Sequence, residues 1–193
     1  SREQAIECIL KSVPPDTIFV ASTGRITREL YALRDLHGTG HQMDFLNVGA
    51  MGHASSIATG IAIANKNKLV VCLDGDAAAI MHLGALTTSG TLGLSNFLHV
   101  VLNNGVHESV GGQETAGFKV NLTQIAKYSG YTTTETWVST KTEIENQIRN
   151  LLLVPAPSFL EIKIKKGIRK NLPPLSLNHQ YFKDIFMEEL RNK

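Results

Sequence analysis

Cysteine is scarce in this sequence. The chain has two cysteines, Cys8 and Cys72, which lie far apart in apolar stretches. Neither belongs to a Cys-x-x-Cys pair, and no group of histidines and cysteines has the spacing of a zinc site. Free thiols persist in a reducing compartment. The sequence therefore predicts two buried free cysteines in a cytoplasmic protein.

Long apolar runs, a signal peptide and a strong charge imbalance are also missing. No apolar run approaches the roughly 18 residues that a membrane-spanning helix requires, and no signal peptide opens the chain. The formal net charge is +2. Basic residues are scattered except for a short run at 163–170, which is typical of a solvated surface. We therefore expect neither a membrane nor a nucleic acid as a partner.

The composition is that of an ordinary globular domain, with 42% hydrophobic and 19% charged residues. Short runs of β-forming residues alternate with longer helical stretches. The third and fourth of these runs are almost continuously apolar, as parallel strands covered on both faces are. Strands are predicted at 17–21, 44–48, 69–73, 98–102, 131–138 and 158–164.

Helical patterns fill the intervals between the predicted strands. Helices are predicted at 2–11, 25–36, 52–64, 78–93, 122–128, 141–153 and 178–191. This alternation predicts an α/β fold, a three-layer α/β/α domain whose mainly parallel sheet has about six strands. Residues 1–170 are expected to form this domain, and residues 171–193 a linker and a C-terminal helix packed on it.

Small or polar residues follow each of the first four predicted strands. They occupy 22–24, 49–53, 74–78 and 103–108. Ligands of open parallel sheets bind beyond the carboxyl ends of the strands. We therefore expect these four loops to meet at one edge of the sheet and to form the binding site.

Asp76 and Asn104 form the sharpest pair within these loops. Each follows a buried strand, and one crossover helix fits between them. A carboxylate, an amide oxygen and a backbone carbonyl suit Mg²⁺, and a helix beginning near Ala78 would present free N–H groups to a phosphate. Either segment alone is also typical of turns and helix caps. Together they predict a magnesium–diphosphate site.

A family resemblance rests on the same residues. Gly-Asp-Ala at 75–77, followed by Asn-Asn at 103–104, resembles the Gly-Asp-Gly…Asn-Asn signature of thiamine-diphosphate-dependent enzymes. The resemblance implies thiamine diphosphate as cofactor, the diphosphate-binding fold of that family, and a Mg²⁺ ion. Its implied metal ligands are the side chains of Asp76 and Asn104 and the carbonyl of Val106.

The resemblance also implies which neighbouring residues contact the diphosphate, namely Gly75, Ala77 and Ala78. The sequence departs from the family at Ala77, where glycine is usual. The additional methyl group permits an N–H contact to phosphate if φ stays negative. Asp74, two residues before the metal ligand, is interpreted as a structural hydrogen-bonding residue.

A second segment carries the resemblance further. Gly-Ala-Met-Gly at 49–52 resembles the segment that supports the bent cofactor in this family. By resemblance, the carbonyl of Gly49 receives the aminopyrimidine amino group and Met51 wedges between the two rings. This arrangement makes proton removal from the thiazolium carbon effectively intramolecular. Thr23 and Gly24 resemble the first diphosphate-side loop. An isolated methionine would otherwise be interpreted as a core residue.

Three longer stretches, at 47–56, 72–82 and 102–113, resemble the phosphonopyruvate decarboxylase family. The similarity covers nearly all of 2–165 and corresponds to the C-terminal half of that family's chain. It implies a carboxy-lyase that converts 3-phosphonopyruvate to phosphonoacetaldehyde and CO₂ in phosphonate biosynthesis. The substrate class it implies is a small-molecule 2-oxo acid.

Family members activate the cofactor with a glutamate from a separate pyrimidine-binding domain. This chain has the strands of one domain and no second copy. We therefore expect an oligomer in which a pyrimidine-binding domain or subunit completes the enzyme. His107 and Glu108 are the candidate catalytic residues, because a phosphonate needs cationic or hydrogen-bonding partners. His53 is a weaker candidate, and His82 and His99 are interpreted as packing residues on their helix and strand.

Alternative functions stay open. A subunit of another 2-oxo acid decarboxylase, such as a sulfopyruvate decarboxylase, fits the same motifs. A non-catalytic nucleotide-binding α/β module is the other alternative. Gly49-x-x-Gly52 follows a strand and Asp74 could bind a ribose, but no Gly-x-Gly-x-x-Gly follows. The Ala77 departure favours a binding module that has lost activity.

Overall fold

A six-stranded parallel sheet forms the centre of the molecule. The computed structural model describes residues 1–173, 175 and 178–191. The strand order is β2-β1-β3-β4-β8-β7, and every pairing is parallel. These strands are β1 (Ile18–Ala21), β2 (Asp44–Leu46), β3 (Val70–Gly75), β4 (Phe97–Asn103), β7 (Thr132–Thr133) and β8 (Ser158–Lys163). The predicted α/β fold with about six mainly parallel strands is confirmed.

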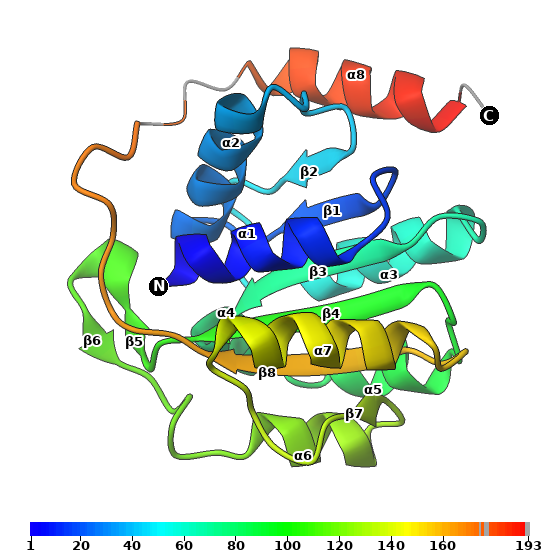
Figure 1. The fold of residues 1–193 in the computed structure, drawn as a ribbon, viewed down its shortest axis with the longest axis vertical. Helices are drawn as coiled ribbons and strands as arrows, with labels where there is room; N and C mark the ends of the chain where they lie inside the picture. Colours follow the sequence, from blue (N-terminus) through cyan, green and yellow to red (C-terminus); the bar gives the residue numbers. More distant parts are fainter. Residues whose placement is uncertain (174, 176–177, 192–193) are drawn as a thin grey trace.

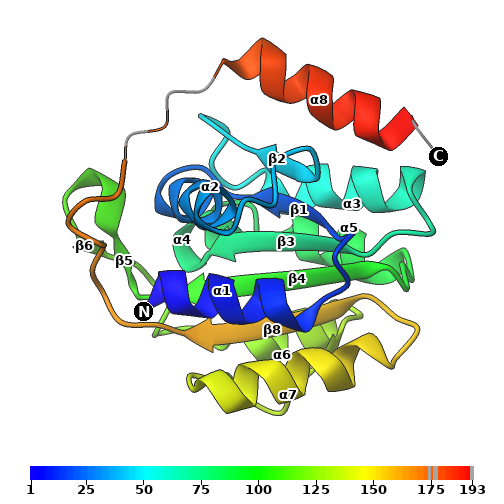
Figure 2. The ribbon, with the colours of Figure 1, turned by 45° about the horizontal axis from the view of Figure 1, so that its top comes forward.

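Helices cover both faces of this sheet, as Figures 1 and 2 show. One face packs against α1 (Arg2–Ser12), α2 (Arg25–His37) and α7 (Lys141–Leu152). The other packs against α3 (Ala54–Ala64), α5 (Ala85–Thr91), α6 (Leu122–Tyr128) and α8 (His179–Arg191). The three layers that the alternating pattern predicts are therefore present.

The first four residues of strand β3 are apolar, and both faces of the sheet account for this. Val71 and Leu73 belong to the core on the α1 face, whereas Val70 and Cys72 belong to the core on the α3 face. Side chains alternate between faces along a strand, so a strand covered on both sides favours apolar residues at successive positions. The predicted free and buried state of both cysteines is confirmed.

Two predicted elements are interrupted in the structure. The helix expected at 78–93 is two helices, α4 (Asp76–Met81) and α5, separated by a turn at 82–84. Gly84 stands in this turn, where glycine weakens a continuous helix. The strand expected at 131–138 is only β7 and a single bridge from Val138 to Ile162. Between them the chain leaves the sheet in a local turn, in which Thr134 Oγ1 donates to the carbonyl of Thr136.

The C-terminal segment returns to the sheet through α8. Phe186 on this helix is buried and stacks edge-on against Phe45, and Arg28 donates hydrogen bonds to the carbonyls of Leu172 and Pro173. Residues 174 and 176–177 of the predicted linker, and residues 192–193 of the predicted tail, lie outside the described residues. No helix within the described ranges is long and apolar enough to cross a membrane.

The carboxyl ends of β3, β4 and β8 lie on the same side of the molecule (Figure 1). Helix α4 begins directly after β3. The chain after β4 forms an antiparallel pair, β5 (Val106–His107) and β6 (Gln113–Glu114), with the short 3₁₀ helix η1 (Glu108–Val110) between them. This edge is where the sequence places the binding site.

Candidate functional site

A cavity of about 60 Å³ lies at the carboxyl edge of the sheet. It is lined by the loop after β1, by Met51, by the start of α4 and by the segment after β4. Every predicted site residue lines it except Gly24, Gly49 and the weaker candidate His53. The lining predicted residues are Thr23, Met51, Gly75, Asp76, Ala77, Ala78, Asn104, Val106, His107 and Glu108.

The two remaining glycines are adjacent to this cavity. The N–H of Gly49 donates to Thr23 Oγ1 at 3.0 Å, which ties the loop after β2 to the loop after β1. A Cβ atom on Gly24 would lie 3.7 Å from Ser109 Oγ, beside the segment that follows β4. The four predicted loops therefore meet at one edge of the sheet, as parallel strands require.

Gly52 explains how the loop after β2 approaches α4 so closely. Its φ is 86°, a value that favours glycine, and a Cβ atom there would lie 2.6 Å from His82 Cδ2 and 3.2 Å from the carbonyl oxygen of Ala78. The loop that carries Met51 thus rests directly on the helix that carries Asp76.

Asp76 is buried and has no cationic partner within ion-pair distance among the described residues. Its Oδ2 accepts a hydrogen bond from Thr115 Oγ1, and its Oδ1 accepts one from the N–H of Asn104 at 3.4 Å. Burial raises the pKa of Asp76, and the hydrogen bonds from Thr115 and Asn104 act in the opposite direction. A buried carboxylate in this state is suited to a metal cation.

The donor set at this point fits Mg²⁺. The Asp76 carboxylate, the Asn104 amide oxygen and the carbonyl of Val106 are hard oxygen ligands, and all three residues line the same cavity. Asn104 Oδ1 also accepts from the N–H of Val106 at 3.2 Å, so the loop after β4 is closed on itself. Ala77 is helical within α4, and no described non-glycine residue has a positive φ. Its N–H can therefore face a phosphate despite the methyl group.

A buried polar network supports this metal pair. Asn103 Nδ2 donates to the carbonyl of Gly117 and to Glu161 Oε1, both at 2.8 Å. A Cβ atom on Gly117 would overlap Asp76 Oδ2 and lie 2.7 Å from Asn103 Oδ1. Only glycine fits between these side chains. Thr115, Gly117 and Glu161 were not predicted from the sequence. The glycines at 111, 112 and 117 are a signal that could have indicated Thr115 and Gly117.

Glu108 has a different environment from Asp76. Its Oε2 accepts from Arg2 Nη1 at 2.6 Å, and its Oε1 accepts from the N–H of Gly167. Arg2 also pairs with buried Glu29, at 2.8 Å from Nε to Oε2. Burial raises the pKa of Glu29, and its ion pair with Arg2 opposes the shift. Both oxygens of Glu108 thus accept hydrogen bonds, one from α1 and one from the segment after β8. These bonds do not favour the catalytic role predicted for Glu108.

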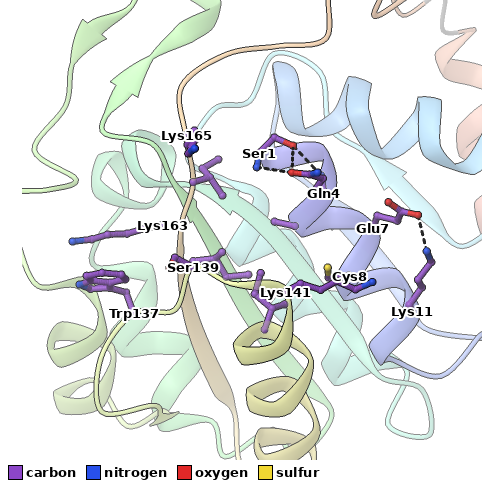
Figure 3. A pocket seen from close by; sticks show the side chains of 14 residues that line it. Ser1, Gln4, Glu7, Cys8, Lys11, Trp137, Ser139, Lys141, Lys163 and Lys165 are labelled. Atoms are coloured by element: carbon purple, nitrogen blue, oxygen red, sulfur yellow. Dashed lines mark hydrogen bonds and ion pairs between the residues drawn. The ribbon is translucent and has the colours of Figure 1, made fainter.

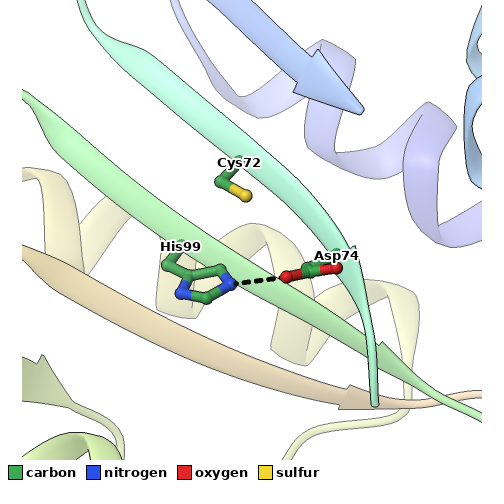
Figure 4. A group of neighbouring side chains, drawn as sticks. All are labelled: Cys72, Asp74 and His99. Carbon is green, nitrogen blue, oxygen red and sulfur yellow. Dashed lines mark ion pairs between the residues drawn. The ribbon is translucent and has the colours of Figure 1, made fainter. Parts of the chain in front are cut away.

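A second group of possible metal ligands lies inside the sheet. Cys72, Asp74 and His99 point to the same side of β3 and β4 and are fully buried (Figure 4). His99 Nε2 lies 3.4 Å from Asp74 Oδ2, while Asp74 Oδ1 accepts the N–H of Gly75 at 2.9 Å. Burial raises the pKa of the Cys72 thiol well above its usual value. The hydrogen bond from the N–H of Gly75 is in line with the structural role predicted for Asp74.

A larger cavity of about 650 Å³ lies away from the predicted site, between α1, α7 and the end of β8 (Figure 3). Lys163 Nζ lies 4.1 Å from the ring centroid of Trp137 at its edge. Lys11 and Lys141, which also line it, lie near Glu7 and Glu145. Its larger volume does not make it the functional site, because none of the predicted residues lines it.

The chain is similar in sequence to several known proteins. Residues 22–162 match the family model described as "Thiamine pyrophosphate enzyme, C-terminal TPP binding domain". Phosphonopyruvate decarboxylase from Streptomyces viridochromogenes is 35% identical over 167 residues, which are 86% of this chain and 40% of that protein. Sulfopyruvate decarboxylase subunit beta from Methanocaldococcus jannaschii is 31% identical over 192 residues, 95% of this chain and 96% of that subunit.

Solved structures share the fold at low sequence identity. A thiamine diphosphate-dependent 4-hydroxybenzoylformate decarboxylase from Rhodococcus jostii superimposes with a TM-score of 0.65 at 18% identity, covering 89% of this chain and 33% of that chain. Transketolase from Campylobacter jejuni superimposes with a TM-score of 0.63 at 17% identity, covering 82% of this chain and 32% of that chain. The chain therefore corresponds to about one third of each of these larger chains.

Proposed function

Because the chain belongs to the thiamine pyrophosphate enzyme family through its C-terminal TPP binding domain, we propose that it binds thiamine diphosphate with Mg²⁺ as one half of a 2-oxo acid decarboxylase. The observation that carries this proposal is the single cavity in which Asp76, Asn104, Val106 and Met51 meet. Under this proposal the enzyme is a carboxy-lyase, completed by a pyrimidine-binding domain or subunit in an oligomer.

Each residue of the cavity has a separate task in this proposal. The side chains of Asp76 and Asn104 and the carbonyl of Val106 hold Mg²⁺ against the diphosphate. The loop around Thr23 and the first turn of α4 position the phosphates. Met51 and the carbonyl of Gly49 keep the cofactor bent. When bound, thiamine diphosphate supplies a thiazolium that accepts the electron pair released as CO₂ leaves.

The proposed substrate is 3-phosphonopyruvate, with phosphonoacetaldehyde as product. The 35% identity to a protein of that activity supports it, although the chain spans only 40% of the length of that relative. A second candidate is sulfopyruvate. A separate beta subunit of a sulfopyruvate decarboxylase matches this chain over 96% of its own length, which also supports a separate partner subunit for this chain.

The metal site is tested by titrating thiamine diphosphate calorimetrically into the chain together with its pyrimidine-binding partner. Wild type should bind with Mg²⁺ and lose most of its affinity without it. Asp76→Asn keeps the shape of the side chain and removes its charge, so we expect affinity in Mg²⁺ to fall about a hundredfold, in line with loss of a charged ligand.

Asp16→Asn is the matched control, because Asp16 is an exposed carboxylate that lies 3.8 Å from Lys68. Asp16 precedes the amino end of β1, whereas the cavity lies at the carboxyl edge of the sheet. The variant should bind like wild type. Binding that is independent of Mg²⁺, or an Asp76→Asn variant equal to the control, would contradict the proposed site. Turnover of phosphonopyruvate, sulfopyruvate and pyruvate by the same assembly then separates the two substrate candidates.

A further inference from the structure

Two arginines line the proposed cofactor cavity, and they differ in their partners. Arg2 is paired with Glu29 and Glu108. Arg25 has no ion-pair partner among the described residues, and its Nε atom is buried without a hydrogen-bond acceptor. A buried donor without an acceptor is costly, and in a ligand cavity it indicates a group that the ligand supplies.

Arg25 lines the same cavity as Asp76. It is the first residue of α2, whose first turn contains no acidic residue. The next residue, Ile26, packs against β3, because a Cβ atom on Gly75 would lie 3.7 Å from Ile26 Cδ1. The preceding Gly24 lies beside Ser109. The two chain neighbours of Arg25 thus lie against the loop of Asp76 and the loop after β4. The positive end of α2 adds to the charge of Arg25.

We propose that Arg25 binds the second anionic group of the substrate, a phosphonate or sulfonate on the carbon next to the 2-oxo group. Its planar guanidinium matches the oxygens of such a group with two parallel hydrogen bonds. Arg25 is then the residue that selects a substrate with two anionic groups over pyruvate. This inference rests on the proposed decarboxylase function.

The reaction itself favours the second anion over the carboxylate. The carboxylate loses its charge as CO₂ leaves, so a fixed cation beside it would stabilise the ground state more than the transition state. A phosphonate or sulfonate keeps its charge throughout, and its binding therefore does not oppose the chemical step. The diphosphate already has Mg²⁺ as its counter-ion under the proposed function.

The test compares Arg25→Met and Arg25→Lys with wild type in the assembly of this chain with its pyrimidine-binding partner. We expect Arg25→Met to raise KM for the preferred two-anion substrate about thirtyfold, with kcat within about threefold. Arg25→Lys keeps the charge and loses the two-bond geometry, so its KM should be intermediate. Activity on pyruvate and the Kd for thiamine diphosphate should stay unchanged in both variants.

Arg28→Met is the matched control, since it removes the same charge one turn further along α2, where Arg28 contacts backbone carbonyls outside the cavity. The inference is overturned if Arg25→Met weakens thiamine diphosphate binding, if it lowers turnover of pyruvate equally, or if it behaves like the control. Failure of the proposed function has a different signature, because wild type would then bind no thiamine diphosphate and decarboxylate none of these acids.

Discussion

Two carboxylates line the cavity at the carboxyl edge of the sheet, and their surroundings are opposite. Glu108 accepts from Arg2 and from the backbone of Gly167, so its charge is balanced within the chain. Asp76 accepts only from neutral donors, Thr115 and the N–H of Asn104. The fold therefore neutralises the charge of Glu108 with Arg2, whereas the charge of Asp76 has no such partner among the described residues. Under the proposed function, a bound Mg²⁺ would balance the charge of Asp76.

The largest expected effect comes from removing the cation of Glu108. Arg2→Met leaves Glu29 and Glu108 without their shared partner. Removing one member of a buried ion pair costs roughly 3–5 kcal/mol, so the free energy of unfolding should fall by about that amount. Urea denaturation measures it. Arg28→Met, which removes surface bonds to backbone carbonyls, should cost less than about 1 kcal/mol. Equal losses in the two variants would show that Arg2 does not hold this edge together.

A smaller effect separates the two carboxylates directly. In buffer without Mg²⁺, Glu108→Gln should lower the free energy of unfolding by about 2 kcal/mol, because a hydrogen bond between charged groups is lost. Asp76→Asn should change it by less than about 1 kcal/mol, since no cation pairs with that carboxylate and an amide oxygen can still accept from Thr115. Equal destabilisation by both substitutions would remove the distinction drawn between them.

The smallest effect concerns the residue that packs against Asp76. Gly117→Ala places a methyl group against Asp76 Oδ2 and 2.7 Å from Asn103 Oδ1, so the carboxylate must shift. We expect Mg²⁺-dependent affinity for thiamine diphosphate to fall about tenfold, the effect of roughly 1.4 kcal/mol. Calorimetric titration in the presence of the partner domain measures it.

Gly60→Ala provides the control for this substitution. A Cβ atom at Gly60 meets nothing within 4 Å, and alanine favours the helix that contains it. Affinity should be unchanged there and stability slightly higher. A Gly117→Ala variant that binds as tightly as Gly60→Ala would show that the carboxylate has room to move.

Much of the fold could be predicted from the sequence, and the errors have identifiable causes. The apolar runs of β3 and β4 predict parallel strands because a strand covered on both faces favours apolar residues at successive positions. The strand expected at 131–138 is mostly absent, although its threonines favour β structure, because pairing depends on a neighbouring strand. The helix expected at 78–93 is interrupted because tertiary packing overrides a weak propensity near Gly84.

The site was predictable where residues act through a short, local pattern. Asp76 and Asn104 each follow a strand, and parallel topology brings the ends of such strands together. The partners of these residues were not predictable. Thr115 bonds to Asp76, and Glu161 bonds to Asn103, through contacts between distant parts of the chain. A local sequence pattern does not show which residues they contact.

The alternation of strands and helices, the loops with small and polar residues, and the Asp76–Asn104 pair were all predictable from the sequence. The ion pair between Arg2 and Glu108 is visible only in the tertiary structure. The same is true of the buried Arg25 Nε, which has no hydrogen-bond acceptor among the described residues. The physical reason is that hydrophobic periodicity and turn chemistry act between near neighbours. The balance of buried charges depends instead on which distant side chains the packed layers bring together.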